Sequence, residues 1–302
     1  MTTCRNCQTR ITPGEWLCRK CGQVVFADEN LEAAVRRELK KPLTRAAIRE
    51  LTELDPFGTE IEYLLGLDSA VNLTRLNLGW NQISDVSPLA SLTNLTELYL
   101  PNNPISDVSA LASLTNLALL YLSDNQISDV SPLASLTNLT RLYLPNNQIS
   151  DVSALASLTT LAQLDLGKNQ ISDISPLASL TNLTRLYLSD NQISDVSPLA
   201  SFTNLTHIWL ENNQITGFSP LASLTDLSTL YLSDNQISDV SPLASLTNLT
   251  HIWFENNQII DVSALASLTN LTHVYLGGNK LNQESIDIHV PNLRSAGVDL
   301  SL

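Results

Sequence analysis

The sequence predicts an α/β solenoid, built from one short strand and one helical turn that recur along most of the chain. Three observations predict it: a period of 22 residues from residue 73 onward, one Asn per repeat, and a fixed frame of apolar positions around that Asn, L-x-x-L-x-L-x-x-N-x-I. The Asn column comprises Asn81, Asn103, Asn125, Asn147, Asn169, Asn191, Asn213, Asn235, Asn257 and Asn279. Such self-similarity indicates repeats that bury one another's apolar faces.

Each part of a repeat has a physical role. Leu142, Leu144 and Ile149 are expected to point inward, and Asn147 lies inside the turn, where a stacked neighbour must hydrogen-bond its amide. In the return segment, Ser131 is predicted to cap a short helical turn and Pro132 to occupy its first position. The Asp that precedes this turn in each repeat, with Gly217 as the exception, is expected to be structural.

The frame is similar to the leucine-rich repeat signature. Its length and the wording SDVSPLASLTNLT resemble the internalin-type class of bacterial leucine-rich repeats over residues 26 to 302. The resemblance implies a horseshoe with a parallel sheet on its concave face, which binds other proteins. Internalins are secreted or surface-anchored, whereas this sequence has no recognisable export signal or anchor, so attachment to host cells is not implied.

Both ends of the solenoid need a cap. Asp28 to Leu39 has the spacing of an amphipathic helix, and Thr44 can cap a second one. A degraded repeat follows, with Thr59 where Asn should stand and Pro56 in the strand. Ser285 to Ala296 is predicted as a helix stopped by Gly297 before a last edge strand. We therefore expect a zinc ribbon at 1–25, a helical cap with the degraded repeat at 26–72, ten repeats at 73–281 and a C-terminal cap at 282–302.

All four cysteines lie near the N-terminus, as Cys4-x2-Cys7 and Cys18-x2-Cys21. Two such knuckles suit one tetrahedral Zn²⁺, and four thiolates leave no open position, so the predicted site is structural. The segment resembles the short zinc ribbons at the N-termini of many prokaryotic proteins. Two disulfides are the alternative, which a reducing compartment disfavours.

The chain has 302 residues, with 16 Lys plus Arg against 30 Asp plus Glu and a net charge of −14. This acidity argues against a general nucleic-acid binder. No apolar run approaches the roughly 20 residues of a membrane span, so no membrane partner is expected and the expected location is cytoplasmic. The ribbon is locally basic, with Arg5, Arg10, Arg19 and Lys20, which keeps nucleic-acid contact open as an alternative.

The third, fifth, seventh and eighth frame positions are predicted to project from the concave face. Where the residue at such a position varies between repeats, we interpret it as not required to maintain the fold. Eight of ten residues at the fifth position are aromatic. Tyr and Trp favour binding surfaces, although neighbouring rings can instead pack to support the sheet. The predicted partner-binding residues are Tyr99, Tyr121, Tyr143, Tyr187, His207, Trp209, Glu211, Tyr231, His251, Trp253, Glu255, His273 and Tyr275.

The segment His207-Ile-Trp209-Leu-Glu211 is nearly copied as His251-Ile-Trp253-Phe-Glu255. Duplication of a 44-residue pair of repeats explains this copy most simply. A pH-sensitive contact beside the carboxylates is a second interpretation, and a metal site of His251, His273 and Glu255 is a third.

No Gly-rich phosphate loop or nucleophile elbow is present, and no cysteine stays free once zinc is bound, so no enzyme is predicted. The sequence predicts a scaffold or adaptor that recognises a protein partner through its aromatic concave face. The alternative is a nucleic-acid-associated protein, in which the ribbon makes the contact and the repeats recruit a second factor.

Overall fold

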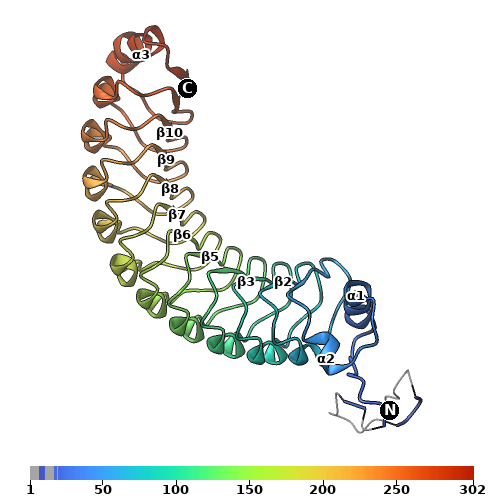
Figure 1. The fold of residues 1–302 in the computed structure, drawn as a ribbon. Coiled ribbons are helices and arrows are strands. Elements are labelled where there is room, and N and C mark those ends of the chain that lie inside the picture. The colour runs from blue at the N-terminus through green and yellow to red at the C-terminus, as the bar shows by residue number, and fades with distance from the viewer. Residues whose placement is uncertain (1–6, 11–16, 19) are drawn as a thin grey trace. The chain divides into compact units, whose positions relative to one another are not determined.

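The computed structural model describes residues 7–10, 17, 18 and 20–302. The chain forms two compact units, Met1–Gln148 and Ile149–Leu302, which are considered in turn. In each unit, short parallel strands follow one another in chain order along one side, and single helical turns follow one another along the opposite side (Figure 1).

The first unit contains five strands among its described residues. They are β1 (Glu53–Leu54), β2 (Arg75–Asn77), β3 (Glu97–Tyr99), β4 (Leu119–Tyr121) and β5 (Arg141–Tyr143). Its 3₁₀ turns are η1 (Leu67–Ser69), η2 (Ser87–Ser91), η3 (Ser109–Ser113) and η4 (Ser131–Ser135). Strands pair one repeat apart, as Leu98 with Leu120, so every repeat keeps the same register.

The second unit repeats this plan. Its strands are β6 (Gln163–Asp165), β7 (Arg185–Tyr187), β8 (His207–Trp209), β9 (Thr229–Tyr231), β10 (His251–Trp253), β11 (His273–Tyr275) and β12 (Asp299–Ser301). Its 3₁₀ turns are η5 (Ser153–Ser157), η6 (Ser175–Ser179), η7 (Ser197–Ser201), η8 (Ser219–Ser223), η9 (Ser241–Ser245) and η10 (Ser263–Ser267). The parallel strands and the repeating turn confirm the predicted solenoid class.

The core lies between the strands and the turns of each repeat. Leu142, Leu144 and Ile149 are fully buried, as the frame predicts. Phe218 and Phe254 are also fully buried, with ring centroids 5.8 Å apart, where other repeats have Val, Ile or Leu. Because each repeat buries its leucines against the next one, stability depends on contacts between neighbours.

The Asn column is hydrogen-bonded as predicted, and nine of its ten members are buried; Asn279, in the last repeat, is half-buried. Asn125 donates its Nδ2 hydrogens to the carbonyls of Leu122 (3.0 Å) and Ser123 (3.0 Å) in its own repeat and of Leu100 (2.9 Å) in the preceding repeat. Its Oδ1 accepts from the backbone N–H of Ile105, at 3.1 Å. One side chain thus satisfies loop groups of two repeats, which explains why the position tolerates no substitution among the ten repeats.

The prediction that Ser caps each helical turn is wrong. Ser131 is the first residue of η4, and the N-cap position before it is occupied by Val130, whose side chain makes no cap hydrogen bond. The cap is the Asp two residues earlier: Asp129 Oδ1 accepts from the Ser131 backbone N–H at 2.8 Å. Asp85, Asp107, Asp151, Asp173, Asp195, Asp239 and Asp261 make the same bond. A carboxylate there meets the unpaired N–H groups at the start of the turn, so the structural role predicted for these acids is confirmed.

Gly217 is where this cap is missing, and we expect Gly217→Asp to raise the Tm by on the order of 2–4 °C. A Cβ at Gly217 would meet no atom within 4 Å, so the new carboxylate can reach the Ser219 N–H unhindered. Thermal unfolding monitored by circular dichroism measures the gain. Gly217→Ala is the control, because it removes the glycine without adding an acceptor. Equal Tm values for the Asp and Ala variants would contradict the cap.

This gain should also depend on pH. Hydrogen bonds from the backbone N–H and the hydroxyl of the following Ser lower the pKa of the caps Asp107 and Asp151. A lowered pKa means that the stabilisation is complete above the carboxyl's ordinary pKa of about 4 and is lost as pH falls through the lowered value. The Tm difference between the Asp and Ala variants should therefore vanish near about pH 2.

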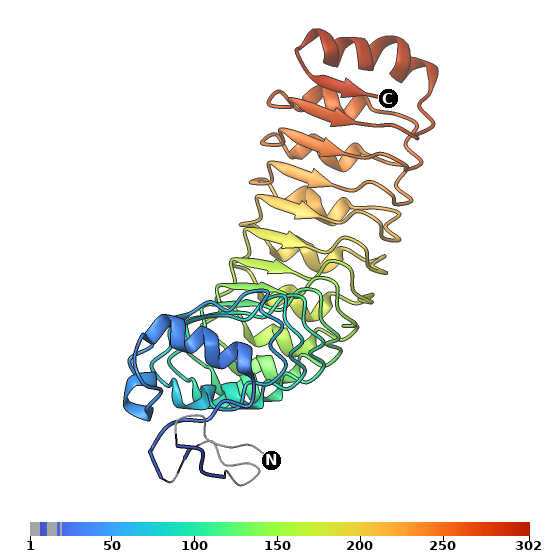
Figure 2. The same ribbon diagram turned by 90° about the vertical axis from the view of Figure 1, so that its right-hand side faces the viewer.

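The N-terminal cap agrees with the prediction. Helix α1 (Glu29–Leu39) begins after Asp28, which caps it, and α2 (Arg45–Ile48) begins after Thr44, whose Oγ1 accepts from the Ala47 N–H. Helix α1 lies against the end of the first unit, beside β1 (Figure 2). The degraded repeat differs in one respect: β1 ends at Leu54, so Pro56 follows the strand instead of lying within it.

The C-terminal cap is a helix of two geometries. A π-helical turn, η11 (Ser285–His289), leads into α3 (Val290–Ser295). Pro291 has no N–H to donate to the carbonyl four residues earlier, which favours the wider turn before it. Gly297, at φ 90°, then ends the helix, and β12 pairs with β11, as predicted for the last edge strand.

Candidate functional site

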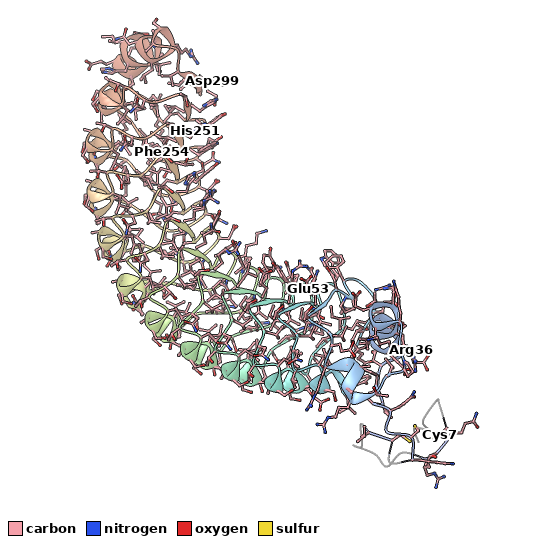
Figure 3. All side chains as sticks on the ribbon, viewed as in Figure 1. Cys7, Arg36, Glu53, His251, Phe254 and Asp299 are labelled. Atoms are coloured by element: carbon pink, nitrogen blue, oxygen red, sulfur yellow. The ribbon has the colours of Figure 1, made fainter. Side chains whose placement is uncertain are left out.

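The third and fifth positions of the frames are at least partly exposed on the solvent side of the sheet, except Leu119 of β4, which is buried. In β8, His207 and Trp209 are partly exposed while Ile208 between them is buried. Figure 3 shows the same alternation beyond β10, with His251 on the strand side and Phe254 inside the repeat. The structure therefore places all the predicted partner-binding residues on this solvent side or at its margin, and each of them is partly exposed.

In the first unit, three tyrosines form a short row on the sheet. The ring centroids of Tyr99 and Tyr121 are 6.4 Å apart, and those of Tyr121 and Tyr143 are 5.0 Å apart. Arg75 lies over Tyr99, its guanidinium carbon 5.3 Å from the ring centroid, and pairs with Glu97 at 3.3 Å. Burial and the hydrogen bond to Glu97 raise the pKa of Tyr99.

In the second unit, five rings form a continuous stack, which we call the aromatic strip: Tyr187, Trp209, Tyr231, Trp253 and Tyr275. Successive centroids are 3.9, 5.4, 3.9 and 5.3 Å apart, with interplanar angles of 11° to 13°. Near-parallel rings at these distances cover one another's faces, so their edges, with the phenol and indole polar atoms, meet the solvent. The packing alternative is thus realised, and it leaves a solvent-facing surface made of ring edges.

The three histidines form a second row beside the aromatic strip. His207 and His251 stack on the indoles of their own strands, at 5.8 Å and 5.7 Å, and His251 stacks on His273 at 4.5 Å. Nδ1 of each histidine lies within 2.9 Å of the hydroxyl of the preceding Thr, such as Thr206.

Neither functional interpretation of the histidines is supported by this geometry. Burial lowers the pKa of His207 and His251; Arg185 further lowers that of His207 and His273 that of His251, and no carboxylate is among these causes. Among the described residues, the one cluster of ligand atoms that could hold a metal ion is formed by cysteines and includes no histidine.

Two carboxylates flank the aromatic strip on its other side. Glu211 accepts a hydrogen bond from Ser189 Oγ at 2.5 Å, and Glu255 accepts one from Ser233 Oγ at 2.8 Å. Burial raises the pKa of Glu211. In each case the Ser belongs to the preceding repeat, so the serines fix both carboxylates in equivalent positions.

Sequence reasoning missed a constraint at the eighth position of the frame. This residue adopts φ between 52° and 57° in nine repeats and is Gly278, at φ 76°, in the last. Asn and Asp tolerate this left-handed conformation best, and they fill seven of those nine positions. The interpretation that residues at varying positions are not required to maintain the fold is therefore wrong for the eighth position. Asp124, Asp190 and Asp234 also accept a hydrogen bond from the Asn one repeat later.

Three of the four predicted zinc ligands are described and lie together. The Sγ atoms of Cys7, Cys18 and Cys21 are all within 4.8 Å of one another, and Cys7 and Cys18 are 3.4 Å apart. Gly22, at φ 70°, donates its N–H to the Cys18 carbonyl and closes the expected tight turn. Hydrogen bonding to Thr9 lowers the pKa of Cys7 to about 6. Cys4 and the basic Arg5 and Arg19 lie outside the described residues.

The geometry fits thiolate coordination of a metal. Four sulfurs at about 2.3 Å from a tetrahedral Zn²⁺ lie about 3.8 Å from one another. The Cys7–Cys18 separation of 3.4 Å and the upper limit of 4.8 Å for all three sulfurs are compatible with that value, so the described cysteines could hold such an ion.

Comparison with known sequence families decides the family. The family described as Leucine Rich repeats (2 copies) matches residues 71–113, 115–157, 159–201, 203–245 and 247–289, which together make up most of the chain. The chain belongs to the leucine-rich repeat family. A comparison with curated proteins gave no match.

Solved structures place these leucine-rich repeats in the internalin type. An internalin (inlF) from Listeria monocytogenes is 37% identical, with 91% of this chain and 88% of that chain covered and a TM-score of 0.78. Internalin C2 (inlC2) from the same organism is 42% identical, with 75% and 93% covered and a TM-score of 0.62. The plant peptide hormone receptor RGFR1 in complex with RGF2, at 21% identity, 79% and 46% coverage and a TM-score of 0.66, shares the fold alone.

Leucine-rich repeat proteins of this type are binding scaffolds, and the chain has the architecture of one. None of the described helices is long and apolar enough to span a membrane.

Proposed function

We propose that this leucine-rich repeat protein binds a protein partner through the aromatic strip of its second unit. The observation that carries the proposal is the continuous stack of five partly exposed rings, Tyr187 to Tyr275, on one rigid sheet. Ring edges supply apolar area together with hydroxyl and indole donors, and stacking fixes the rings before a partner arrives. Little side-chain entropy is then lost on binding. The tyrosine row of the first unit is a second, shorter candidate surface.

The combined variant Tyr187→Ala, Trp209→Ala and Trp253→Ala should reduce capture of the native partner from lysate at least tenfold, because aromatic anchors carry most interface energy. Pull-down followed by mass spectrometry measures it, and circular dichroism confirms that the repeats remain folded. Trp80→Asn is the control: it removes an exposed Trp of the first unit and gives the left-handed position the residue found in other repeats. Unchanged capture by the triple variant would refute the proposal.

We also propose that one structural Zn²⁺ is held by the thiolates of Cys7, Cys18 and Cys21, with Cys4 as the fourth ligand. The clustering of the three described sulfurs supports this. When bound, the ion supplies folding free energy to a segment too short to bury a core of its own. The chain's own contribution is the Cys18 to Gly22 turn and the N–H of Val24, which donates to Leu43 and joins the segment to the helical cap.

The protein purified under reducing conditions should contain about one zinc atom per chain, and Cys18→Ser should lose it. Native mass spectrometry measures this directly, since zinc adds mass whereas disulfides remove hydrogens. The Cys variant should keep the circular dichroism spectrum of the repeats, because the repeats have their own core. A folded chain that contains no zinc, with its thiols either free or paired as disulfides, would overturn the proposal.

A further inference from the structure

The duplication in the second unit is a duplication of geometry as well as of sequence. The strip consists of two tight pairs, Tyr187 with Trp209 and Tyr231 with Trp253, each 3.9 Å between centroids, and wider steps separate one pair from the next ring. Each Trp has a stacked His on one side along its strand and a Ser-held Glu on the other. The face therefore presents the same set of groups twice.

The two sets lie a fixed distance apart. Trp209 pairs in register with Tyr231, and Tyr231 with Trp253, so equivalent residues are two strands apart. With about 4.8 Å between strands, Glu211 and Glu255 are separated by about 10 Å along the strip.

The carboxylates of Glu211 and Glu255 favour a cationic ligand. Of the charged groups near Glu211, Asp190 and Asp234 are also acidic, and neither Glu211 nor Glu255 takes part in an ion pair among the described residues. No Lys or Arg occupies the strand face from β8 to β11. Burial lowers the pKa of His207 and His251 and so disfavours the cationic form that would compete with such a ligand.

The spacing selects the conformation of the ligand. A polyproline II helix has three residues per turn and rises about 3.1 Å per residue, so side chains three apart lie on one face about 9 Å apart. Residues three apart in a β-strand point to opposite faces. An α-helix places residues seven apart about 10 Å apart, but its carbonyls are bonded internally. Polyproline II carbonyls are free, and the phenol edges of Tyr231 and Tyr275 provide donors for them.

We propose that strands β7 to β11 bind a polyproline II segment in which two Arg or Lys side chains, three residues apart, pair with Glu211 and Glu255. The segment crosses the strands along the aromatic strip, with its backbone on the ring edges. This inference rests on the proposed protein-binding role of the strip and specifies the chemistry of the partner there.

Fluorescence anisotropy with the full chain at low salt tests this with three labelled peptides of equal charge. One has Arg-Pro-Pro-Arg spacing, one has Arg-Pro-Arg spacing, and one is an Ala-rich helix with Arg seven residues apart. We expect the first to bind at least about tenfold more tightly than the others, because only it makes two charge-assisted contacts together with backbone hydrogen bonds. Equal affinities, or tightest binding of the helix, would overturn the proposal.

Charge-neutral variants provide the second arm. Glu211→Gln and Glu255→Gln should each weaken binding of the Arg-Pro-Pro-Arg peptide about tenfold. Asp226→Asn is the matched control: it removes the same charge from an exposed position outside the strand face, where other repeats carry Asn. Loss of affinity in the control equal to that in the Glu variants would indicate general electrostatic attraction and refute the specific pairing.

The outcomes separate this inference from the proposed function. If the triple aromatic variant loses its native partner but no Arg-Pro-Pro-Arg peptide binds, the strip binds protein of another kind and only the inference fails. If capture of the native partner does not depend on the rings, the proposed function fails, whatever the peptides do.

Discussion

Asn235→Ala should lower the free energy of unfolding by about 3 kcal/mol, a large effect for one substitution. Asn235 is 8% exposed and makes four hydrogen bonds. Its Nδ2 group donates to the carbonyls of Leu210, Leu232 and Ser233, at 2.9, 3.1 and 3.2 Å. Its Oδ1 accepts from the Ile215 N–H at 3.0 Å.

The backbone groups that bond to Asn235 are not affected equally by its replacement with Ala. The Leu210 carbonyl keeps a hydrogen bond from Asn213, and the Leu232 carbonyl keeps one from Asn257. The Ile215 N–H has no such substitute among the hydrogen bonds of the described residues. The cost is therefore dominated by one buried donor without an acceptor, about 1–3 kcal/mol, and the remainder comes from three weakened carbonyls.

Urea unfolding followed by circular dichroism measures the total, and hydrogen exchange at the Ile215 amide measures the local cause. Asn248→Ala is the control within the same repeat, because exposed Asn248 makes one bond, to the Thr225 carbonyl. It should cost under about 1 kcal/mol. Similar losses for Asn235 and Asn248 would contradict the argument from burial.

Asn235→Asp tests the direction of the hydrogen bonds. A carboxylate oxygen would replace the Nδ2 donor and face carbonyl oxygens, so the folded state should favour the protonated acid and raise its pKa. A raised pKa places the destabilisation at neutral pH and relieves it as pH falls below the folded value. We therefore expect the stability gap between this variant and the native chain to narrow toward about pH 4.

The repeat and the buried Asn could be predicted because one polar residue recurs inside an apolar frame, and only a hydrogen-bonded role permits that. The cap of the helical turn could not be assigned as easily. Ser131 and Asp129 both suit an N-cap, and the choice depends on whether the turn begins at Ser131 or one residue later, which propensity does not resolve.

The sequence predicted which positions lie on the strand face, but it did not predict how the side chains there pack against one another. Alternation places Trp209 and Trp253 outward, but the alternating 3.9 Å and 5.4 Å steps depend on side-chain torsions that the sequence does not specify. The environment of the histidines could not be predicted from the sequence either. Glu211 and Glu255 are near the histidines in sequence, yet the pKa of His251 is lowered by burial and by His273 on the next strand.

The left-handed conformation of the eighth position could not be recognised easily, because several residue types occupy that position. Trp80 and Lys168 stand there beside Asn, Asp and Gly, so the column resembles an unconstrained surface position. A count of Asn, Asp and Gly alone would have indicated it, because these residues favour positive φ.

Asp28→Ala should lower the free energy of unfolding of the N-terminal cap by about 2–4 kcal/mol. The sequence predicts a helix from Asp28, but the structure gives this carboxylate two tasks. Oδ1 accepts from the N–H groups of Asn30 and Leu31, at 2.9 and 3.0 Å, and caps α1. Oδ2 accepts from the N–H groups of Glu62 and Tyr63, at 2.8 and 3.3 Å, and joins the helix to the first, degraded repeat.

Asp28→Asn separates these tasks. Asn is as good an N-cap as Asp, so Oδ1 still caps α1. The amide NH₂ replaces Oδ2 and opposes the N–H groups of Glu62 and Tyr63, donor against donor. The Asn variant should therefore keep a folded α1 yet lose hydrogen-exchange protection at these two amides, whereas the Ala variant loses both.

Thr44→Ala is the matched control, since Thr44 caps α2 through one bond to the Ala47 N–H and its side chain makes no other hydrogen bond with the part of the chain that the structure describes. It should cost about 1 kcal/mol. If Asp28→Ala costs no more than this, the bonds to Glu62 and Tyr63 contribute nothing. If Asp28→Ala loses more free energy of unfolding than Thr44→Ala, and Asp28→Asn loses an intermediate amount, the Asp28 carboxylate joins the cap to the solenoid. Its loss would then expose the edge of the first repeat to pairing with other chains.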